Sequence, residues 1–263
     1  MAQDQGYQLD FSLGTWSNLD GGSGIESNGG IDGTDDRLQG DISLSYARDM
    51  GSFTGVAALH FGYITEADDS LDTDDATRGV LDLTLRALFD RGDVTYGGFI
   101  GYGKQDDYGD SDEDMTYAYI GAEFSRDVAW GSYYGQIGYF TGDDEYTEAT
   151  RDAPFINLGA NYGLANGVEL YGALGYAGGT KYSSDYPNRT VDLRLGARRD
   201  FGGFTGYVEA QSIQISYDDG TRYGDTFNSI SVGMTMTFGS DMDHGTDLPE
   251  FGRWSAYNAN EVE

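Results

Sequence analysis

Residues 77–90, with the sequence TRGVLDLTLRALFD, alternate between apolar and polar side chains. The odd positions from 81 to 89 carry Leu, Leu, Leu, Ala and Phe, whereas the even positions 82, 84 and 86 carry Asp, Thr and Arg. A period of two is that of a β-strand with one apolar and one polar face. The segment is therefore predicted to be a strand whose two faces meet different surroundings.

The same alternation recurs along the chain, most clearly in residues 189–200, 167–178 and 229–238. It predicts twelve strands, which average about a dozen residues, twice the usual length of a soluble strand and close to what a tilted strand needs to cross a bilayer. We place them at Gln5–Ser17, Arg37–Ala47, Ser52–Thr65, Thr77–Phe89, Val94–Lys104, Met115–Arg126, Ser132–Thr141, Ala153–Tyr162, Gly167–Ala177, Arg189–Arg199, Phe204–Tyr217 and Thr226–Phe238.

The connections between these strands alternate between short and long. Four of the five short ones carry an adjacent Arg/Asp pair followed by glycine, in ARDMG, FDRGD, SRDVAWG and ARRDFGG, which marks a repeat of one hairpin. The long ones are mostly acidic and span 18–36, 66–76, 105–114, 142–152, 178–188 and 218–225. Short turns at one end and long loops at the other are typical of outer-membrane barrels.

Composition excludes several classes of protein. The chain of 263 residues has no cysteine, so disulfide scaffolds and zinc-thiolate sites are excluded. A net charge of −30 makes nucleic acid an improbable partner. No stretch approaches 18 apolar residues, as a transmembrane helix would need, but a barrel strand shows only alternate side chains to lipid. Ala2-Gln3 after Met1 is expected to be the start of a mature chain after signal-peptide cleavage.

Prolines and aromatics fit the predicted strands. Pro187 is placed in a loop, Pro154 at a strand's first residues and Pro249 beyond the last strand, where no ladder is broken. Aromatic residues gather near both strand ends, as two interfacial girdles would require, with ordinary strand propensity as the alternative. The long-loop girdle would contain Tyr63, Tyr102, Phe140, Tyr176 and Tyr217, and the short-turn girdle Tyr46, Phe53, Phe89, Phe124, Trp130, Tyr162 and Phe204.

Over residues 5–238 the chain resembles Gram-negative outer-membrane barrels of the porin-like or small-channel class. In that class the last strand usually ends in an aromatic residue that the assembly machinery reads, and Phe238, closing SISVGMTMTF, matches. The chain departs from the pattern by continuing through residues 239–263. The resemblance implies an all-β, closed, transmembrane antiparallel barrel of twelve strands in the cell outer membrane. Its partners would be outer-membrane lipid, lipopolysaccharide and the barrel assembly machinery, and a homo-oligomer is left open.

If the apolar faces meet lipid, the polar faces line the lumen. The candidate pore-lining residues are Asp10, Asp41, His60, Asp82, Arg86, Glu123, Glu169, Asp192, Arg194, Arg198 and Glu209. Their acidic excess predicts a water-filled pore that prefers cations. The alternative is that the charges pair with one another and close the lumen. We expect each arginine to pair with a nearby acid, Arg86 with Asp82 or a neighbouring strand, and Arg194 with Asp192 or Glu209.

Other chemistry is thinly represented. The acidic runs EADDSLDTDDA, QDDYGDSDED and GDDEYTE could bind divalent cations, but none matches a calcium-loop motif and solvated loops are the simpler interpretation. The histidines are His60 and His244, too few and too far from lipid for a hydrolytic site, so we expect neither catalysis nor a cofactor. The tail, 239–263, is assigned to the periplasm or the lumen, with a disordered terminus as the alternative.

Together these patterns predict a passive diffusion channel for small hydrophilic solutes, with a preference for cations. The rival prediction is a structural or adhesive surface barrel that does not conduct and whose acidic loops bind something outside.

Overall fold

A computed structural model describes residues 5–18, 37–66, 77–105, 115–143, 150–181, 187–218 and 222–239. All of the regular structure in these ranges is β-strand, and no helix in them is long and apolar enough to cross a membrane. The strands are β1 Gln5–Asn18, β2 Arg37–Asp49, β3 Thr54–Glu66, β4 Thr77–Arg91, β5 Val94–Gln105, β6 Met115–Val128, β7 Gly131–Asp143, β8 Thr150–Arg151, β9 Ala153–Gly163, β10 Val168–Lys181, β11 Pro187–Asp200, β12 Thr205–Asp218 and β13 Arg222–Gly239.

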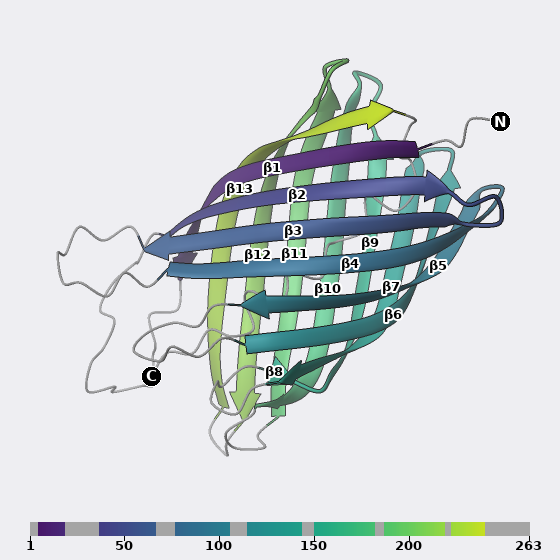
Figure 1. Cartoon of the computed structure of the whole chain (residues 1–263). Helices are drawn as coiled ribbons and strands as arrows, with labels where there is room; N and C mark the ends of the chain where they lie inside the picture. The colour runs from purple at the N-terminus through teal and green to yellow at the C-terminus, as the bar shows by residue number, and fades with distance from the viewer. Residues whose placement is uncertain are drawn as a thin grey trace.

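The strands form one closed antiparallel sheet (Figure 1). Each long strand pairs with its neighbours in sequence, and the sheet closes where β1 pairs with β13 along its whole length, from Gly6 opposite Gly239 to Asn18 opposite Phe227. Closure removes both free edges, which a sheet in lipid cannot leave unpaired. The prediction of an all-β transmembrane barrel is confirmed.

The two-residue strand β8 does not add a further stave to the barrel. It pairs with β10 at Thr180 and Lys181, beyond the point where β9 pairs with the same strand. Between β8 and β9 lies Asp152, whose φ of 53° is that of a left-handed residue at a bulge. Thr141 Oγ1 of β7 donates a hydrogen bond to the Asp152 carboxylate at 2.9 Å. Strands β8 and β9 are thus one interrupted strand, and the barrel has the twelve strands that the sequence predicts.

The five short turns all lie at the end of the barrel where β1 begins and β13 ends (Figure 1). Two of the repeated Arg/Asp turns share one mechanism. Asp49 accepts a hydrogen bond from the backbone N–H of Gly51, and Asp200 accepts one from Gly202, each at 2.6 Å. Both glycines have φ above +80°, which only glycine adopts without strain. The repeat in the sequence is therefore a repeat of turn chemistry.

The predicted strand ends shift by a few residues at the long-loop end. There, β11 begins at Pro187, which the sequence prediction placed in a loop, and proline is tolerated because it is the first residue of the strand. Strand β13 begins at Arg222 and not at Thr226, and β10 continues to Lys181. The loop predicted at 218–225 is shorter for this reason. Pro249, the tail and most residues of the acidic runs lie outside the described residues.

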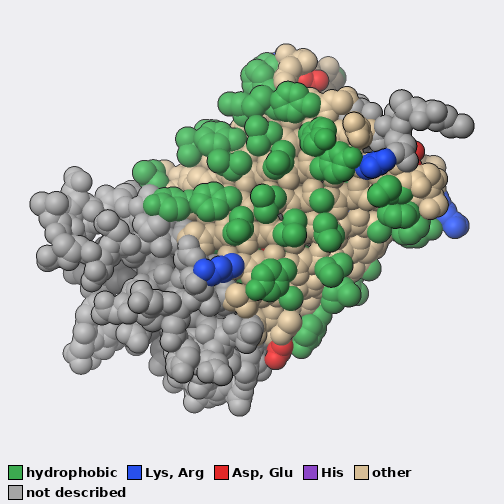
Figure 2. Space-filling view, viewed as in Figure 1, with side chains coloured by type: hydrophobic (Ala, Val, Ile, Leu, Met, Phe, Trp, Pro, Cys, Tyr) green, Lys and Arg blue, Asp and Glu red, His purple; other side chains and the backbone are tan. Residues whose placement is uncertain are grey.

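The outer face of the barrel is an apolar band (Figure 2). Leu81, Leu83 and Leu85, the residues whose alternation predicted β4, are each between 45% and 49% exposed. Between them, Asp82 and Thr84 point inward and are buried. In Figure 2 the lysine and arginine side chains lie at the margins of this band, where they can reach the headgroups. The exterior is built for lipid contact.

Aromatic side chains flank the band. At the short-turn end they stack in pairs, with Phe89 on Tyr96 at 5.7 Å between ring centroids and Trp130 on Tyr162 at 6.2 Å. In the predicted long-loop girdle, the side chain of Tyr217 lies outside the described part of the structure, and the prediction for Phe140 is wrong. Phe140 points inward and is completely buried, because it lies on the inward parity of β7. Parity along the strand, and not distance from the strand end, decides whether an aromatic ring meets lipid.

Candidate functional site

The eleven residues predicted to line a pore all face the inside of the barrel. Most are buried, and Asp10, Glu169 and Arg198 are half-buried. They alternate with the lipid-facing residues along every strand, as the period of two requires. The interior of the barrel is therefore the candidate functional site.

His60 lies in a polar network on β1, β2 and β3. Its Nδ1 is 2.9 Å from Ser43 Oγ, and its Nε2 is 3.5 Å from Asp41 Oδ1. The other oxygen of Asp41 accepts hydrogen bonds from Ser12 at 3.1 Å and Gln39 at 2.6 Å. Serine, histidine and aspartate are also the residues of hydrolytic triads. In the usual triad the serine contacts Nε2 and the aspartate contacts Nδ1, whereas here Ser43 contacts Nδ1 and Asp41 lies near Nε2. The network places the Asp41 carboxylate on the inner wall and stabilises it with hydrogen bonds.

Asp82 lies directly across the ladder from His60 and is 1% exposed. Its Oδ1 accepts hydrogen bonds from Thr84 at 3.0 Å and from the Tyr119 hydroxyl at 2.7 Å. Its Oδ2 has no hydrogen-bond partner among the described residues. The predicted pairing of Asp82 with Arg86 stays a prediction.

Two arginines form the predicted pairs with acids. Arg194 contacts Asp192 of its own strand through Nε at 2.9 Å and through a terminal nitrogen at 2.8 Å, and Gln211 donates to the other carboxylate oxygen at 2.9 Å. Arg198 donates from Nε to Glu169 of β10 at 2.7 Å. Both arginines lie on β11, across the barrel from β4, which carries Arg86. The arginines therefore do not form one cluster.

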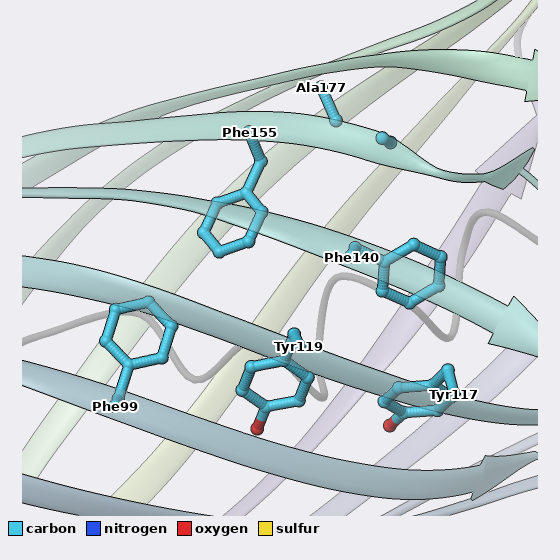
Figure 3. Close-up of a cluster of buried hydrophobic side chains, with 7 residues drawn as sticks. Phe99, Tyr117, Tyr119, Phe140, Phe155 and Ala177 are labelled. Carbon is cyan, nitrogen blue, oxygen red and sulfur yellow. The ribbon is translucent and has the colours of Figure 1, made fainter.

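The sequence prediction missed a cluster of aromatic side chains inside the described part of the barrel. Phe99, Tyr117, Tyr119, Phe140 and Phe155 pack together along the inner wall of β5, β6, β7 and β9 (Figure 3). Neighbouring rings lie 5.6 to 6.3 Å apart between centroids. We call these five residues the aromatic wall. In Figure 3 the hydroxyls of its two tyrosines point to the same side.

Glycines on the neighbouring strands make room for these rings. A Cβ added at Gly101 would overlap the ring of Tyr119, and one added at Gly103 would overlap that of Tyr117. The rings therefore lie flat over the glycine backbone and do not stand across the lumen. The same arrangement recurs outside the wall, where Tyr134 covers Gly159, Tyr171 covers Gly196 and Tyr207 covers Gly233.

The flat arrangement lets a tyrosine reach a carboxylate two strands away. Tyr119 of β6 crosses Gly101 of β5 to donate to Asp82 of β4. In the same way, Tyr207 of β12 crosses Gly233 of β13 to donate to Asp10 of β1, at 2.9 Å. Two of the predicted pore-lining acids, Asp82 and Asp10, therefore each accept a hydrogen bond from a tyrosine two strands away.

A signal for these pairs was present in the sequence. Strand β5 has glycine at three inward positions, 97, 101 and 103, and β6 places tyrosines at 117 and 119. Aligning the two strands as a hairpin sets Gly101 opposite Tyr119 and Gly103 opposite Tyr117. The prediction missed the pairs because it considered each strand alone, and strand β5 alone carries glycine and aromatic residues on both faces.

A second buried carboxylate lies farther along the interior. Glu123 of β6 accepts a hydrogen bond from Gln136 at 3.2 Å, and Asn157 donates to Gln136 at the same distance. These three side chains form a row across β6, β7 and β9. Among the described residues no group of three or more His, Asp or Glu is arranged to hold a metal ion.

Comparison with known proteins gives the fold a context. No protein-family model and no curated protein matches the chain. An outer-membrane channel from Pseudomonas putida F1 matches with a TM-score of 0.57 and 12% identity, over 90% of this chain and 97% of that one. The translocator domain of the autotransporter NalP from Neisseria meningitidis matches with a TM-score of 0.51 and 16% identity over 90% of both chains. The KdgM porin, solved in complex with disordered oligogalacturonate, matches with a TM-score of 0.51 and 10% identity, over 88% and 99% of the two chains.

The fold is that of bacterial outer-membrane β-barrels. The apolar outer band and the closed sheet agree with this similarity. The similar structures include channels as well as an autotransporter domain, so at these identities they establish the fold and not the activity.

Proposed function

We propose that this protein is an outer-membrane channel for the passive diffusion of small hydrophilic solutes, with a preference for cations. The observation that carries the proposal is the charge of the inward face. Among the described inward-facing side chains that are buried or half-buried, seven are carboxylates and three are guanidinium groups, an excess of four carboxylates. The carboxylates are Asp10, Asp41, Asp82, Glu123, Glu169, Asp192 and Glu209, and the guanidinium groups are those of Arg86, Arg194 and Arg198.

An excess of this kind is difficult to keep in a dry interior. Removing a carboxylate from water costs several kcal/mol even after the protein relaxes, unless an opposite charge compensates. Asp192 and Glu169 have arginine partners, whereas Asp82 accepts its hydrogen bonds from the neutral hydroxyls of Thr84 and Tyr119. Water and mobile cations in the lumen would supply the missing compensation.

The dimensions of the barrel support a lumen with room for solutes. Twelve tilted strands at the usual strand spacing give a backbone radius of about 12 Å. On β2 and β13 the inner wall carries small side chains, including Ser43, Ser45, Ser229 and Ser231. On β5 to β9 the rings lie flat on glycines.

Cation preference follows from the same excess of carboxylates. Fixed negative charge on the wall raises the local concentration of cations and lowers that of anions. The pairs Arg194–Asp192 and Arg198–Glu169 each have no net charge, so they change the cation preference little.

One observation favours the rival function, a structural or adhesive surface barrel that does not conduct. Several inward side chains are almost inaccessible, with Asp82 at 1%, His60 at 2% and Phe140 at 0% exposed. A closed lumen would leave the acidic loops as the functional part of the protein. The two functions differ in a directly measurable quantity, the ion conductance.

The test is single-channel recording of the purified full-length protein in a planar bilayer under a KCl gradient. The proposal expects discrete conductance steps and a reversal potential on the cation-selective side. Glu209→Gln should reduce the selectivity, whereas Asp127→Asn, an equal charge change at an exposed residue of the short-turn end, should leave it nearly unchanged. Folded protein that inserts and carries no current would establish the rival, and anion selectivity at neutral pH would refute the cation preference.

A further inference from the structure

We propose that Asp82 and the aromatic wall form a binding site for a primary ammonium ion that carries an apolar group. The inference rests on the proposed function in one respect, that the ligand reaches the site through the lumen. Two independent features of the structure point to this ligand class.

The first feature is an incompletely bonded carboxylate. Asp82 is 1% exposed, and the hydrogen bonds from Thr84 and Tyr119 both end on its Oδ1. Its Oδ2 makes no hydrogen bond of normal distance and angle within the described part of the chain, and the Tyr117 hydroxyl is the side-chain donor that also acts on this carboxylate. A buried anion with one oxygen left over is stabilised by a cation that also donates a hydrogen bond. An ammonium N–H⁺ group meets both requirements.

The second feature is the surface next to this carboxylate. On β5 the residue opposite Asp82 is Gly103, so no side chain separates the carboxylate from Tyr117 on β6. The Tyr117 and Tyr119 rings stack at 6.3 Å with an angle of 20° between their planes, and Phe140 packs on Tyr117 at 5.6 Å. Aromatic faces attract cations and apolar groups alike.

The combination selects an organic ammonium ion over the alternatives. A divalent metal ion needs several oxygen ligands, and the residues described here provide no group of three or more acids and histidines for it. An anion would be repelled by the negative charge of Asp82. A neutral apolar solute would contact the rings but would leave Oδ2 without a partner. An amine with an apolar portion satisfies the carboxylate and the rings together.

The second buried acid in a similar position does not form an equivalent site. Glu123 also has an oxygen without a hydrogen-bond partner among the described residues. Its neighbours in the row are Gln136 and Asn157, which are amides and not aromatic rings. It serves as an internal comparison, a buried acid whose hydrogen-bonded neighbours are amides and not tyrosine hydroxyls.

Binding is measured by isothermal titration calorimetry on the full-length barrel in detergent, with benzylammonium as the probe. Benzyl alcohol and benzoate test the need for positive charge, and methylammonium tests the need for an apolar group. We expect benzylammonium to bind at least about tenfold more tightly than each of them, as one ion pair or one cation–π contact would give. If methylammonium bound as tightly as benzylammonium, charge attraction alone would explain the binding, and the proposal would be overturned.

Two variants locate the site. Asp82→Asn keeps an acceptor for Tyr119 and Thr84 but removes the charge, and it should weaken benzylammonium binding by at least about tenfold. Tyr119→Leu should weaken benzylammonium about three- to twentyfold and methylammonium less. The matched control is Glu123→Gln, which removes an equal charge from a carboxylate that is bonded to Gln136 and not to the tyrosines of the wall, and it should change the affinity by less than about twofold. Equal effects of Asp82→Asn and Glu123→Gln would overturn the assignment.

The outcome separates the two proposals. Calorimetry needs no conduction, so a protein that binds benzylammonium but carries no current would retain this inference and lose the proposed function. A protein that conducts and shows no benzylammonium binding, and no block of its current by millimolar benzylammonium, would retain the proposed function and lose this inference.

Discussion

Gly101→Ala tests whether the flat rings are structural parts of the wall. Gly101 faces inward on β5, and a Cβ at this position would overlap the ring of Tyr119. That ring is 4% exposed, packs against Phe99 and donates to Asp82, so it cannot turn aside without breaking contacts. The smallest possible addition, one methyl group, therefore perturbs a connection that spans three strands.

The magnitude follows from two contributions. Overfilling a packed interior by a methyl group typically costs about 1–3 kcal/mol. Displacing the Tyr119 hydroxyl from a buried, charged acceptor costs about 1.5–3 kcal/mol when the bond is lost, and less when it only lengthens. The Tyr119 ring can shift to make room for the methyl group, but this shift weakens its hydrogen bond to Asp82. The cost of overfilling and the cost of the lost hydrogen bond therefore do not add in full. We expect a loss of about 3 kcal/mol in the free energy of unfolding.

The assay is reversible urea unfolding of the barrel in lipid or detergent, followed by tryptophan fluorescence. Gly98→Ala is the matched control on the same strand. Its Cβ would point outward and meet only the Gly121 carbonyl oxygen, at 3.4 Å, so its effect should stay within about 0.5 kcal/mol. In a Tyr119→Ala background the penalty of Gly101→Ala should largely vanish, a coupling of about 3 kcal/mol between the two positions.

Two results would refute the reasoning. The first is equal stability of Gly101→Ala and Gly98→Ala, which would mean that the ring moves freely. The second is an unchanged penalty in the Tyr119→Ala background, which would place the cost of the methyl group in the backbone and not in the ring.

Three further predictions concern charge. Arg194→Ala should raise the single-channel conductance and strengthen cation preference, since it removes bulk and a positive charge that neutralises Asp192; unchanged currents through a folded barrel would contradict it. Cation preference should weaken as pH falls through about 4, where unperturbed carboxylates protonate, and reversal potentials constant from pH 7 to pH 3 would contradict this. In the turn after β4, the hydrogen bond from Arg126 Nε at 2.9 Å holds the pKa of Asp93 below its usual value. A depressed pKa in the folded state means that the contribution is present above the unfolded pKa and lost as pH falls through the folded one. Asp93→Asn should therefore slightly lower the stability at pH 6 and not at pH 2, as measured by urea unfolding.

The sequence alone was sufficient to predict the barrel and its orientation of faces. Alternation in residues such as Leu81, Asp82 and Leu83 is a local property, because a strand turns successive side chains to opposite sides whatever its neighbours are. The turns are local as well, since Asp49 and Gly51 make their hydrogen bond within three residues. For the same reason the pairing of Arg194 with Asp192, two residues apart on one face, could be predicted.

Only the tertiary structure decided which inward side chains of different strands meet. Asp10 accepts hydrogen bonds from Tyr207 and Thr235, residues that come near it only because the sheet closes between β1 and β13. Tyr119 reaches Asp82 only because the register places Gly101 beneath its ring. Register and closure are set jointly by all the strands, and a period of two contains no information about either. The sequence therefore determined which residues face the lumen, and the closed sheet determined how they combine into a site.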